Sequence, residues 1–187
     1  MSPAFGNRNS QHLQEMAKQK MKLDQKGFSL IELIIVVCII GIIASVSIPN
    51  LLAARRSANE GSTVYAMRTL HGAQMSYHIT TGNGNYAGTA VSGDTAAFTQ
   101  LAAVGLIDSV LASRTKSGYI YVGGRILATQ TAPGQFYVSA LPTTTSGVTQ
   151  TGTRRFAIAT DGVIKADTTL TGQYADLTAV SNAAALR

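Results

Sequence analysis

Glu32 has the most unusual chemical setting in this 187-residue chain, because it lies inside an otherwise apolar run. The run extends from Phe28 to Ile48 and reads FSLIELIIVVCIIGIIASVSI. As a helix it would be about 31 Å long at about 1.5 Å per residue, close to the thickness of a bilayer core. A carboxylate in that core costs about 2.5 to 3.5 kcal/mol, so Glu32 needs a cationic partner or a function. The simpler alternative is that Glu32, near the edge of the run, reaches the headgroups and suits the positive end of the helix.

Basic residues precede this apolar run. Residues 1–27 carry five Lys or Arg side chains against two Asp or Glu, which is half of the formal net charge of +6. Because basic segments stay on the cytoplasmic side, we expect a single span with a cytoplasmic N-terminus and everything after Pro49 on the other face. The basic composition is therefore not evidence for nucleic-acid binding.

Composition narrows the class of protein further. With 45% hydrophobic and 13% charged residues, the chain is not a disordered polyelectrolyte. It has one cysteine, Cys38, so an intramolecular disulfide is excluded and the core must hold by packing.

A specific motif surrounds Glu32, namely Lys26-Gly27-Phe28-Ser29-Leu30-Ile31-Glu32. It resembles the processing site of type IV pilins and of the pseudopilins of type II secretion systems, and the resemblance extends to about Leu52. It implies that a membrane peptidase cuts between Gly27 and Phe28 and that Phe28 is then N-methylated. Glycine suits the scissile position because it has no side chain to obstruct the carbonyl.

Cleavage would give Glu32 its missing partner. A new α-amine has a reference pKa of about 7.7 to 8.0, so the terminus at Phe28 would be largely cationic, and N-methylation leaves it basic. When one helix is shifted along a neighbour, the amine of Phe28 would meet Glu32 of the previous subunit and fix the register. The motif therefore predicts a helical filament of identical subunits.

Gly41 and Pro49 match a glycine and a proline that, in several filaments of this family, bracket a stretch of helix that loosens on assembly. Both residues also have ordinary explanations. Gly41 and Ser45 form a small-xxx-small pair that favours close helix contact, and Pro49 removes a helix hydrogen bond near the membrane exit. Both alternatives stay open here, and Cys38 is interpreted as a small buried hydrophobe.

Three parts are predicted along the chain. They are a leader over residues 1–27, a membrane-spanning assembly helix over residues 28–52 and a head over residues 53–187. The leader is long for type IVa pilins, although type IVb pilins have long leaders. We expect translation to start at Met21, which would give the seven-residue leader MKLDQKG.

The head is predicted to begin with the rest of the long helix, which continues to about Thr80. Apolar residues recur there at steps of three or four, at Val64, Met67, Leu70, Ala73 and Tyr77. Asn83-Gly84-Asn85 predicts the end of that helix, and a second short helix is expected from about Thr95 to Val104.

A small antiparallel sheet is predicted next, because the apolar period changes to two. The expected strands are Tyr119 to Leu127, Gln135 to Leu141, Arg154 to Thr160 and Val163 to Ala166. Asp161-Gly162 predicts a two-residue hairpin between the last two. The fold class is therefore α+β, with a long N-terminal helix whose first half spans the membrane, packed against a sheet of about four strands.

Two features of the predicted head bear on its surface. Type IVa pilins often close a C-terminal loop with a disulfide, and this head has no cysteine, so that loop is absent or held another way. Pro142 to Thr153 is predicted to be a loop, and its many hydroxyl side chains are either simply solvated or O-glycosylated.

Catalysis, a cofactor and a metal site are not predicted. His71 and His78 would lie about 10.5 Å apart along a helix, too far to share one metal ion. The acids Asp161, Asp167 and Asp176 are too scattered in the sequence to claim a calcium site. The glycines near residues 82–84 and 123–124 lack the spacing of a phosphate-binding loop.

Two other functions fit the sequence less well than a filament subunit does. DNA capture, as in competence pilins, would use the pair Arg154-Arg155, which opens a predicted strand. An ordinary secretory signal would use Ser45 and Ser47 before a cut at Ile48, but Glu32 would weaken its apolar core.

The function most consistent with these residues is a structural, non-enzymatic subunit of a type IV pilus, with a pseudopilin of type II secretion as the alternative. The expected partners are further copies of the chain, a prepilin peptidase and N-methyltransferase, an inner-membrane assembly platform with its ATPase, and the membrane. Nucleic acid is not expected. The precursor is expected in the inner membrane and the mature protein at the cell surface.

Overall fold

The computed structural model describes residues 27–186 of the chain. The predicted leader lies outside the described residues except for Gly27, and so do Lys26 and the expected start at Met21. The described residues divide into two compact units at Ser47 and Ile48. We describe each unit by itself.

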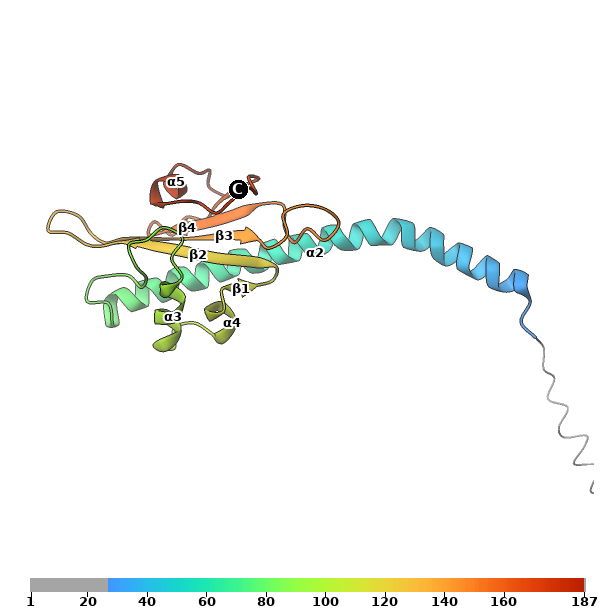
Figure 1. Ribbon diagram of the computed structural model, residues 1–187, viewed down its shortest axis with the longest axis horizontal. Helices are drawn as coiled ribbons and strands as arrows, with labels where there is room; N and C mark the ends of the chain where they lie inside the picture. The colour runs from blue at the N-terminus through green and yellow to red at the C-terminus, as the bar shows by residue number, and fades with distance from the viewer. Residues whose placement is uncertain (1–26, 187) are drawn as a thin grey trace, which may run out of the picture. The chain divides into compact units, whose positions relative to one another are not determined.

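One helix, α2, runs from Leu30 to Thr80 over 51 residues (Figure 1). Its first part is the apolar run, which has no strong helix breaker before Pro49, and the helix continues through that proline. It ends before Asn83 and Gly84, whose φ angles of 46° and 82° lie in the left-handed region that a helix cannot use. The predicted end at about Thr80 is confirmed.

A five-stranded antiparallel sheet follows, in the order β1-β2-β3-β4-β5. Its strands are β1 Thr115–Lys116, β2 Tyr119–Ile126, β3 Gln135–Pro142, β4 Arg155–Ala159 and β5 Lys165–Asp167. The main ladder joins β2 to β3, with Tyr121 opposite Ala140. The α+β class is confirmed, with one strand more than expected, because the two-residue strand β1 is too short to show a period.

The core lies between one face of this sheet and the part of α2 that follows Ile48. Alternate residues of β3 and β4 point to that face, and these are Phe136, Val138, Ala140, Phe156 and Ile158. They pack with the buried helix residues Ala66, Met67, Leu70 and Ala73, as the step of three or four predicts.

The opposite face of the sheet is also covered. Tyr137, Ala157 and Ala159 point to it and form a second buried cluster with Tyr174 and Val180 of the C-terminal segment. In Figure 1 this segment, with helix α5 (Leu177–Ser181), lies across the sheet from α2. The alternation of β3 and β4 therefore supplies apolar residues to both faces of the sheet.

Three short helices complete the described residues. Helix α3 (Ala96–Ala103) confirms the helix expected from about Thr95 to Val104. Helices α4 (Ser109–Ala112) and α5 were not predicted, since four or five residues cannot show a helical period. Each begins at an aspartate whose carboxylate accepts a backbone hydrogen bond, Asp108 for α4 and Asp176 for α5.

The last connection differs from its prediction. The turn lies at Asp161-Gly162, as expected, and Gly162 has a φ of 71°. However, β4 ends at Ala159 and β5 begins at Lys165, so the connection is longer than a two-residue hairpin. The Asp161 carboxylate accepts a hydrogen bond from the backbone N–H of Val163, which extends the turn.

Candidate assembly site and the ion pairs of the head

The predicted processing site lies at the start of the described residues. Gly27, Phe28 and Ser29 precede the first helical residue, Leu30, so the Gly27–Phe28 peptide bond is outside the helix. Phe28 is 78% exposed, and a side chain added at Gly27 would meet nothing within 4 Å. A peptidase can therefore approach this bond without unwinding α2.

Glu32 lies in the first turn of α2, where a carboxylate suits the positive end of a helix. Its side chain is exposed, and it has no hydrogen bond or ion pair with any residue in the range 27–186. Within the described chain nothing satisfies this charge.

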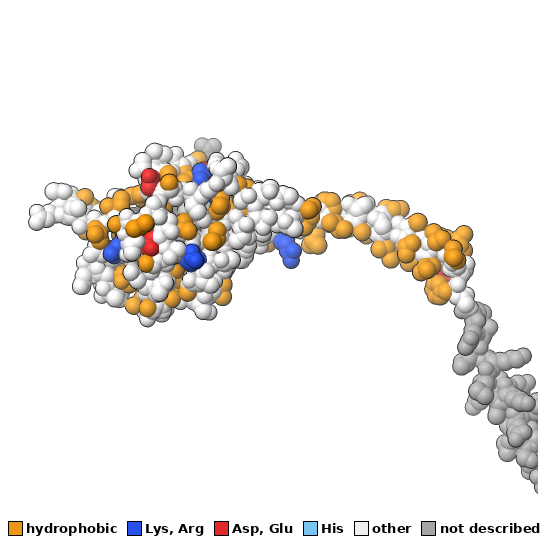
Figure 2. Space-filling model, in the orientation of Figure 1, with side chains coloured by type: hydrophobic (Ala, Val, Ile, Leu, Met, Phe, Trp, Pro, Cys, Tyr) orange, Lys and Arg blue, Asp and Glu red, His pale blue; other side chains and the backbone are white. Residues whose placement is uncertain are grey.

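The apolar side chains of the run that contains Glu32 are also exposed. Leu30 is 75% exposed and Ile42 is 69% exposed, and the orange surface of this part of α2 in Figure 2 shows the same pattern. The helix is long and apolar enough to cross a membrane, by length and composition. An apolar surface of this extent needs a cover of lipid or protein.

The other residues singled out in this run have plain surroundings. Gly41 has nothing within 4 Å of the position that a side chain would take. The hydroxyl of Ser45 donates to the carbonyl of Ile42 at 2.8 Å, so this polar group is satisfied within the helix. Cys38 is exposed in the single chain, which does not fit its interpretation as a buried hydrophobe unless another molecule covers it.

A second glutamate of α2, Glu60, is placed very differently. It is buried, and its carboxylate accepts hydrogen bonds from the backbone N–H and the hydroxyl of Thr153, at 2.7 and 2.6 Å. The Nε of Arg154 donates to the other carboxylate oxygen at 2.9 Å, and Nη2 of the same guanidinium forms an ion pair with that oxygen at 2.8 Å. Burial by itself would raise the pKa of Glu60, but these hydrogen bonds and the positive charge hold it below its ordinary value.

The loop between β3 and β4 is fastened to α2 around Glu60. The Asn59 amide donates to the carbonyl of Thr151 at 2.9 Å, and Arg56 donates to the carbonyl of Gln150 at 3.3 Å. The predicted loop from Pro142 to Thr153 is confirmed as irregular chain, although Pro142 itself ends β3. Its far end is held to the helix by charged and polar contacts.

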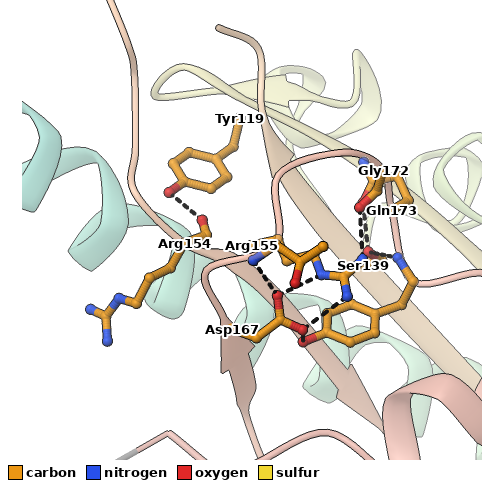
Figure 3. A network of polar contacts seen from close by, with 9 residues as sticks. Tyr119, Ser139, Arg154, Arg155, Asp167, Gly172 and Gln173 are labelled. Carbon is orange, nitrogen blue, oxygen red and sulfur yellow. Dashed lines mark hydrogen bonds and ion pairs between the residues drawn. The ribbon is translucent and has the colours of Figure 1, made fainter. Parts of the chain in front are cut away.

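A third cluster holds the C-terminal segment on the sheet, and Figure 3 shows it from close by. Arg155 on β4 donates to both carboxylate oxygens of Asp167, at 2.8 and 2.9 Å, and to the carbonyl of Gly172 at 2.9 Å. The hydroxyl of Tyr174 donates to Asp167 at 2.8 Å, and the Arg155 guanidinium lies 4.0 Å from the centre of the Tyr174 ring. We call Arg155, Asp167 and Tyr174 the C-terminal clasp.

The clasp is extended by amide and hydroxyl groups. The Gln173 amide donates to the carbonyl of Ile120, and the Ser139 hydroxyl lies between Gln173 and the backbone N–H of Tyr174. The C-terminal segment is thus held on the sheet by an ion pair, hydrogen bonds and ring contacts.

The protonation of the clasp follows from its contacts. Burial would raise the pKa of Asp167, but Arg155 and Tyr174 together bring it below its ordinary value. Burial and the neighbouring Asp167 carboxylate raise the pKa of Tyr174 to about 12. The clasp is therefore fully formed at neutral pH, with Asp167 ionised and Tyr174 protonated.

The arginines considered for DNA capture are both engaged. Arg154 pairs with Glu60 and lies 5.4 Å from the Phe156 ring, and Arg155 pairs with Asp167. Their positive charges are compensated inside the head, so the structure does not favour them as a phosphate-binding pair.

The remaining titratable candidates are not brought together. Asp161 lies 3.5 Å from Lys165, whereas Asp167 and Asp176 serve the clasp and α5. His78 stacks on Tyr86, while the buried Nε2 of His71 has no hydrogen-bond partner in the described chain. Among the described residues, no group of three His, Cys, Asp or Glu side chains could hold a metal ion.

Glu60 was missed by the sequence analysis. Its position among the buried helix residues was a usable signal, because an acid on the apolar side of an amphipathic helix needs a partner. Its partners Thr153 and Arg154 follow it by more than ninety residues, beyond the reach of any local pattern.

The exposed apolar helix and the motif ahead of it resemble those of a prepilin. The family model of the prokaryotic N-terminal methylation motif matches residues 22–48. This motif is a substrate site for a modifying enzyme, not an activity of the chain that carries it.

The chain is also similar to the Type IV wide pilus major component PilA4 of Thermus thermophilus. The two are 69% identical over 35 residues, which is 19% of this chain and 27% of that protein. The chain thus matches about a quarter of the length of this relative. No solved structure matches the chain.

The motif and this identity show a similarity to type IV pilins that is confined to the N-terminal part of the chain.

Proposed function

We propose that this chain is the structural subunit of a type IV pilus, assembled through α2 after cleavage between Gly27 and Phe28. One observation carries the proposal. Directly after the cleavage motif, an uncovered apolar helix contains a carboxylate, Glu32, that has no partner within residues 27–186. Both the apolar surface and the charge need a second molecule.

The cut supplies what Glu32 lacks. Hydrolysis of the Gly27–Phe28 bond creates an α-amine on Phe28, which is largely protonated near neutral pH and stays basic after N-methylation. In a low-dielectric environment an amine of one subunit and Glu32 of its neighbour attract strongly, and only one helix register brings them together. Processing therefore converts a stored subunit into one that can assemble.

The three proposed parts of the chain fit this sequence of events. Residues 1–27 are the leader that is removed, residues 28–52 first hold the subunit in the inner membrane and then pack in the filament, and residues 53–187 form the head. The proposed partners are further copies, a prepilin peptidase and N-methyltransferase, and an inner-membrane platform driven by an ATPase. The mature filament would lie at the cell surface.

Gly41 and Pro49 are the proposed points at which α2 loosens during assembly. Pro49 has no backbone N–H to donate, and Gly41 adds no side-chain contact in the single chain, so both weaken the helix locally. Loosening this stretch would let helices pack more closely around it.

The test is a Glu32→Val substitution in cells that make the protein, with Cys38→Val as the control in the same apolar run. We expect both variants to insert in the membrane in equal amounts, measured by immunoblotting of membrane fractions. Glu32→Val should lower the yield of sheared filaments at least about tenfold by electron microscopy, since each subunit contact loses its ion pair. An unchanged yield would remove Glu32 from assembly.

A comparison of the wild-type strain with a strain that lacks this chain separates the pilus from the pseudopilin of type II secretion. A pilus subunit gives fibres outside the wild-type cell. Loss of protein secretion by a deletion strain, with no surface fibres in the parent, would instead assign the chain to a secretion system.

A further inference from the structure

A cavity of about 340 Å³ lies in the head where the β3–β4 loop meets α2. Helix α2 contributes Leu52, Arg55 and Asn59 to its wall, the β1–β2 turn contributes Ser117, and the loop contributes Val148 and Thr149. The contacts of Asn59 and Arg56 with the loop hold these walls together. The cavity is thus part of the folded head and not a gap beside a free loop.

The cavity carries an uncompensated positive charge. Arg55 is exposed and has no hydrogen bond or ion pair with any residue in the described range 27–186. Among the described residues that line the cavity, none is acidic. The nearest acid on the helix, Glu60, is already engaged by Thr153 and Arg154, so it does not neutralise Arg55.

The rest of the wall is divided between polar and apolar groups. Asn59 uses one N–H on the carbonyl of Thr151 and Ser117 pairs with the hydroxyl of Ser62. The second N–H of Asn59 and the hydroxyl of Thr149 are left to bind the oxygens of an anion. Leu52 and Val148 are apolar, and Val148 is 74% exposed. A wall of this composition fits a phosphate ester that carries hydrocarbon better than it fits a free inorganic ion.

The position of the cavity along α2 points to the source of such an ester. Leu52 follows Ile48, the last residue of the apolar run, by one helical turn, which is about 6 Å. Each headgroup layer of a bilayer is about 5 to 7 Å deep beyond the hydrocarbon core. Leu52 therefore lies at the level of the headgroup phosphates when the run spans the membrane. Arg55 follows three residues later, and its long side chain can reach that level because helical side chains lean toward the N-terminus of the helix.

We propose that this cavity binds the phosphate of an anionic phospholipid headgroup while the subunit is stored in the membrane, with Arg55 as the cation that binds it. The inference rests on the membrane-anchored stage of the proposed function and not on filament assembly. It gives the stored subunit a specific lipid contact that must be released before the subunit leaves the bilayer.

The test uses the full-length chain, labelled with ¹⁵N and purified in the uncharged detergent dodecyl maltoside. It is titrated with dihexanoyl phosphatidylglycerol, and the amide signals of Ser117, Gly118 and Thr149 are followed by NMR. We expect saturable shifts at these amides. Dihexanoyl phosphatidylcholine, which has no net charge, should need a concentration higher by about fivefold, because one basic residue near a lipid surface contributes about 1 kcal/mol. Inorganic phosphate, at matched ionic strength, should also need a higher concentration, because it has no hydrocarbon to contact Leu52 and Val148.

Two matched variants test whether Arg55 supplies the positive charge that binds the lipid. Arg55→Gln should raise the half-saturating concentration of phosphatidylglycerol about fivefold, as expected for one basic residue at a lipid surface. Arg68→Gln removes another exposed arginine of α2 that does not line the cavity, and it should leave the titration unchanged. Both substitutions are at exposed positions, so the head should fold normally.

Several results would overturn the proposal. The absence of shifts at the three amides would show that the cavity is not a site, and equal effects of the two arginine variants would show diffuse charge attraction. Equal affinity for inorganic phosphate would show a free-anion site, and equal affinity for phosphatidylcholine would show that the charge of the lipid is irrelevant. Because no filament is needed, these results are independent of the assembly test.

Discussion

Glu32 and Glu60 lie on the same helix, α2, but their carboxylates have opposite surroundings. Glu60 is buried in the head and accepts hydrogen bonds from Thr153 and Arg154. Glu32 is exposed in the apolar run and has no such partner within residues 27–186. The head thus satisfies the charge of Glu60, whereas the apolar run leaves the charge of Glu32 for another molecule.

This difference separates folding from assembly along one continuous element. An ion pair within the chain stabilises the chain, and removing one partner leaves a buried charge unsatisfied. A carboxylate that the chain does not pair contributes little to folding, so its value lies in a contact between chains. Substitution of Glu32 should therefore affect filament assembly, whereas substitution of Glu60 should affect the stability of the head.

The largest expected effect comes from comparing Glu32→Gln with Glu60→Gln. We expect Glu32→Gln to leave the free energy of unfolding of the head unchanged while filament yield falls at least about tenfold, because the subunit contact loses its ion pair. Glu60→Gln should lower the free energy of unfolding by about 2 kcal/mol, since the amide cannot replace a charged acceptor of three donors.

The stability measurement can be confined to the head. All seven tyrosines follow residue 64, so near-ultraviolet circular dichroism of the full chain in uncharged detergent reports on the head during urea unfolding. Arg68→Gln, an exposed charge change on the same helix, should cost less than about 0.5 kcal/mol. Loss of head stability in Glu32→Gln would contradict the proposal that Glu32 serves assembly and not folding.

A smaller effect is expected at the C-terminal clasp. Asp167→Asn should lower the free energy of unfolding by about 1.5 kcal/mol, because Arg155 loses a charged partner. It should also speed proteolytic cleavage after residue 167, read by mass spectrometry of limited digests. The control Asp161→Asn alters a half-exposed pair at 3.5 Å and should cost less than about 0.5 kcal/mol, so equal effects of the two would contradict the clasp.

The smallest expected effects are those of pH. Glu60 and Asp167 have pKa values below their ordinary values of 4.5 and 3.8 in the folded head, because of the hydrogen bonds and arginine charges described above. The folded state therefore binds fewer protons than the unfolded state in this range. Its stability is complete above about pH 5 and is lost as the pH falls through the lowered values.

At alkaline pH the stability of the folded head changes with pH in the opposite direction. Burial and the Asp167 carboxylate raise the pKa of Tyr174 from 10.0 to about 12, so the folded state keeps a proton that the unfolded state releases. Stability is complete below about pH 10 and is lost as the pH rises toward about 12. Urea midpoints across pH should show both limbs, and Asp167→Asn should flatten the acid limb. An unchanged acid limb in this variant would exclude Asp167 as a contributor.

The sequence predicted those elements that are long enough to show a period. The apolar run, the end of α2 at Asn83 and Gly84, and the strands β2, β3 and β4 follow from spacing and turn residues. The two-residue β1 and the short helices α4 and α5 show no period, so only tertiary contacts define them. The second apolar face of the sheet was hidden for the same reason, since its cover comes from the irregular C-terminal segment.

The site was predictable to a different degree in the two regions. Gly27, Phe28 and Glu32 lie within one short motif, so their proposed roles could be inferred from local chemistry. Glu60 and Arg154 are separated by a helix and most of the sheet, and only the fold brings them together. The pair Arg154-Arg155 looked like a free basic patch because the sequence does not show that Glu60 and Asp167 compensate it.

Cleavage that creates the cationic partner of Glu32 is the central step of the proposed assembly. The direct measurement is N-terminal sequencing and mass spectrometry of the chain recovered from sheared cell-surface filaments. We expect every molecule to begin at an N-methylated Phe28. A mature chain that begins at any other residue, or that retains Gly27, would contradict the account.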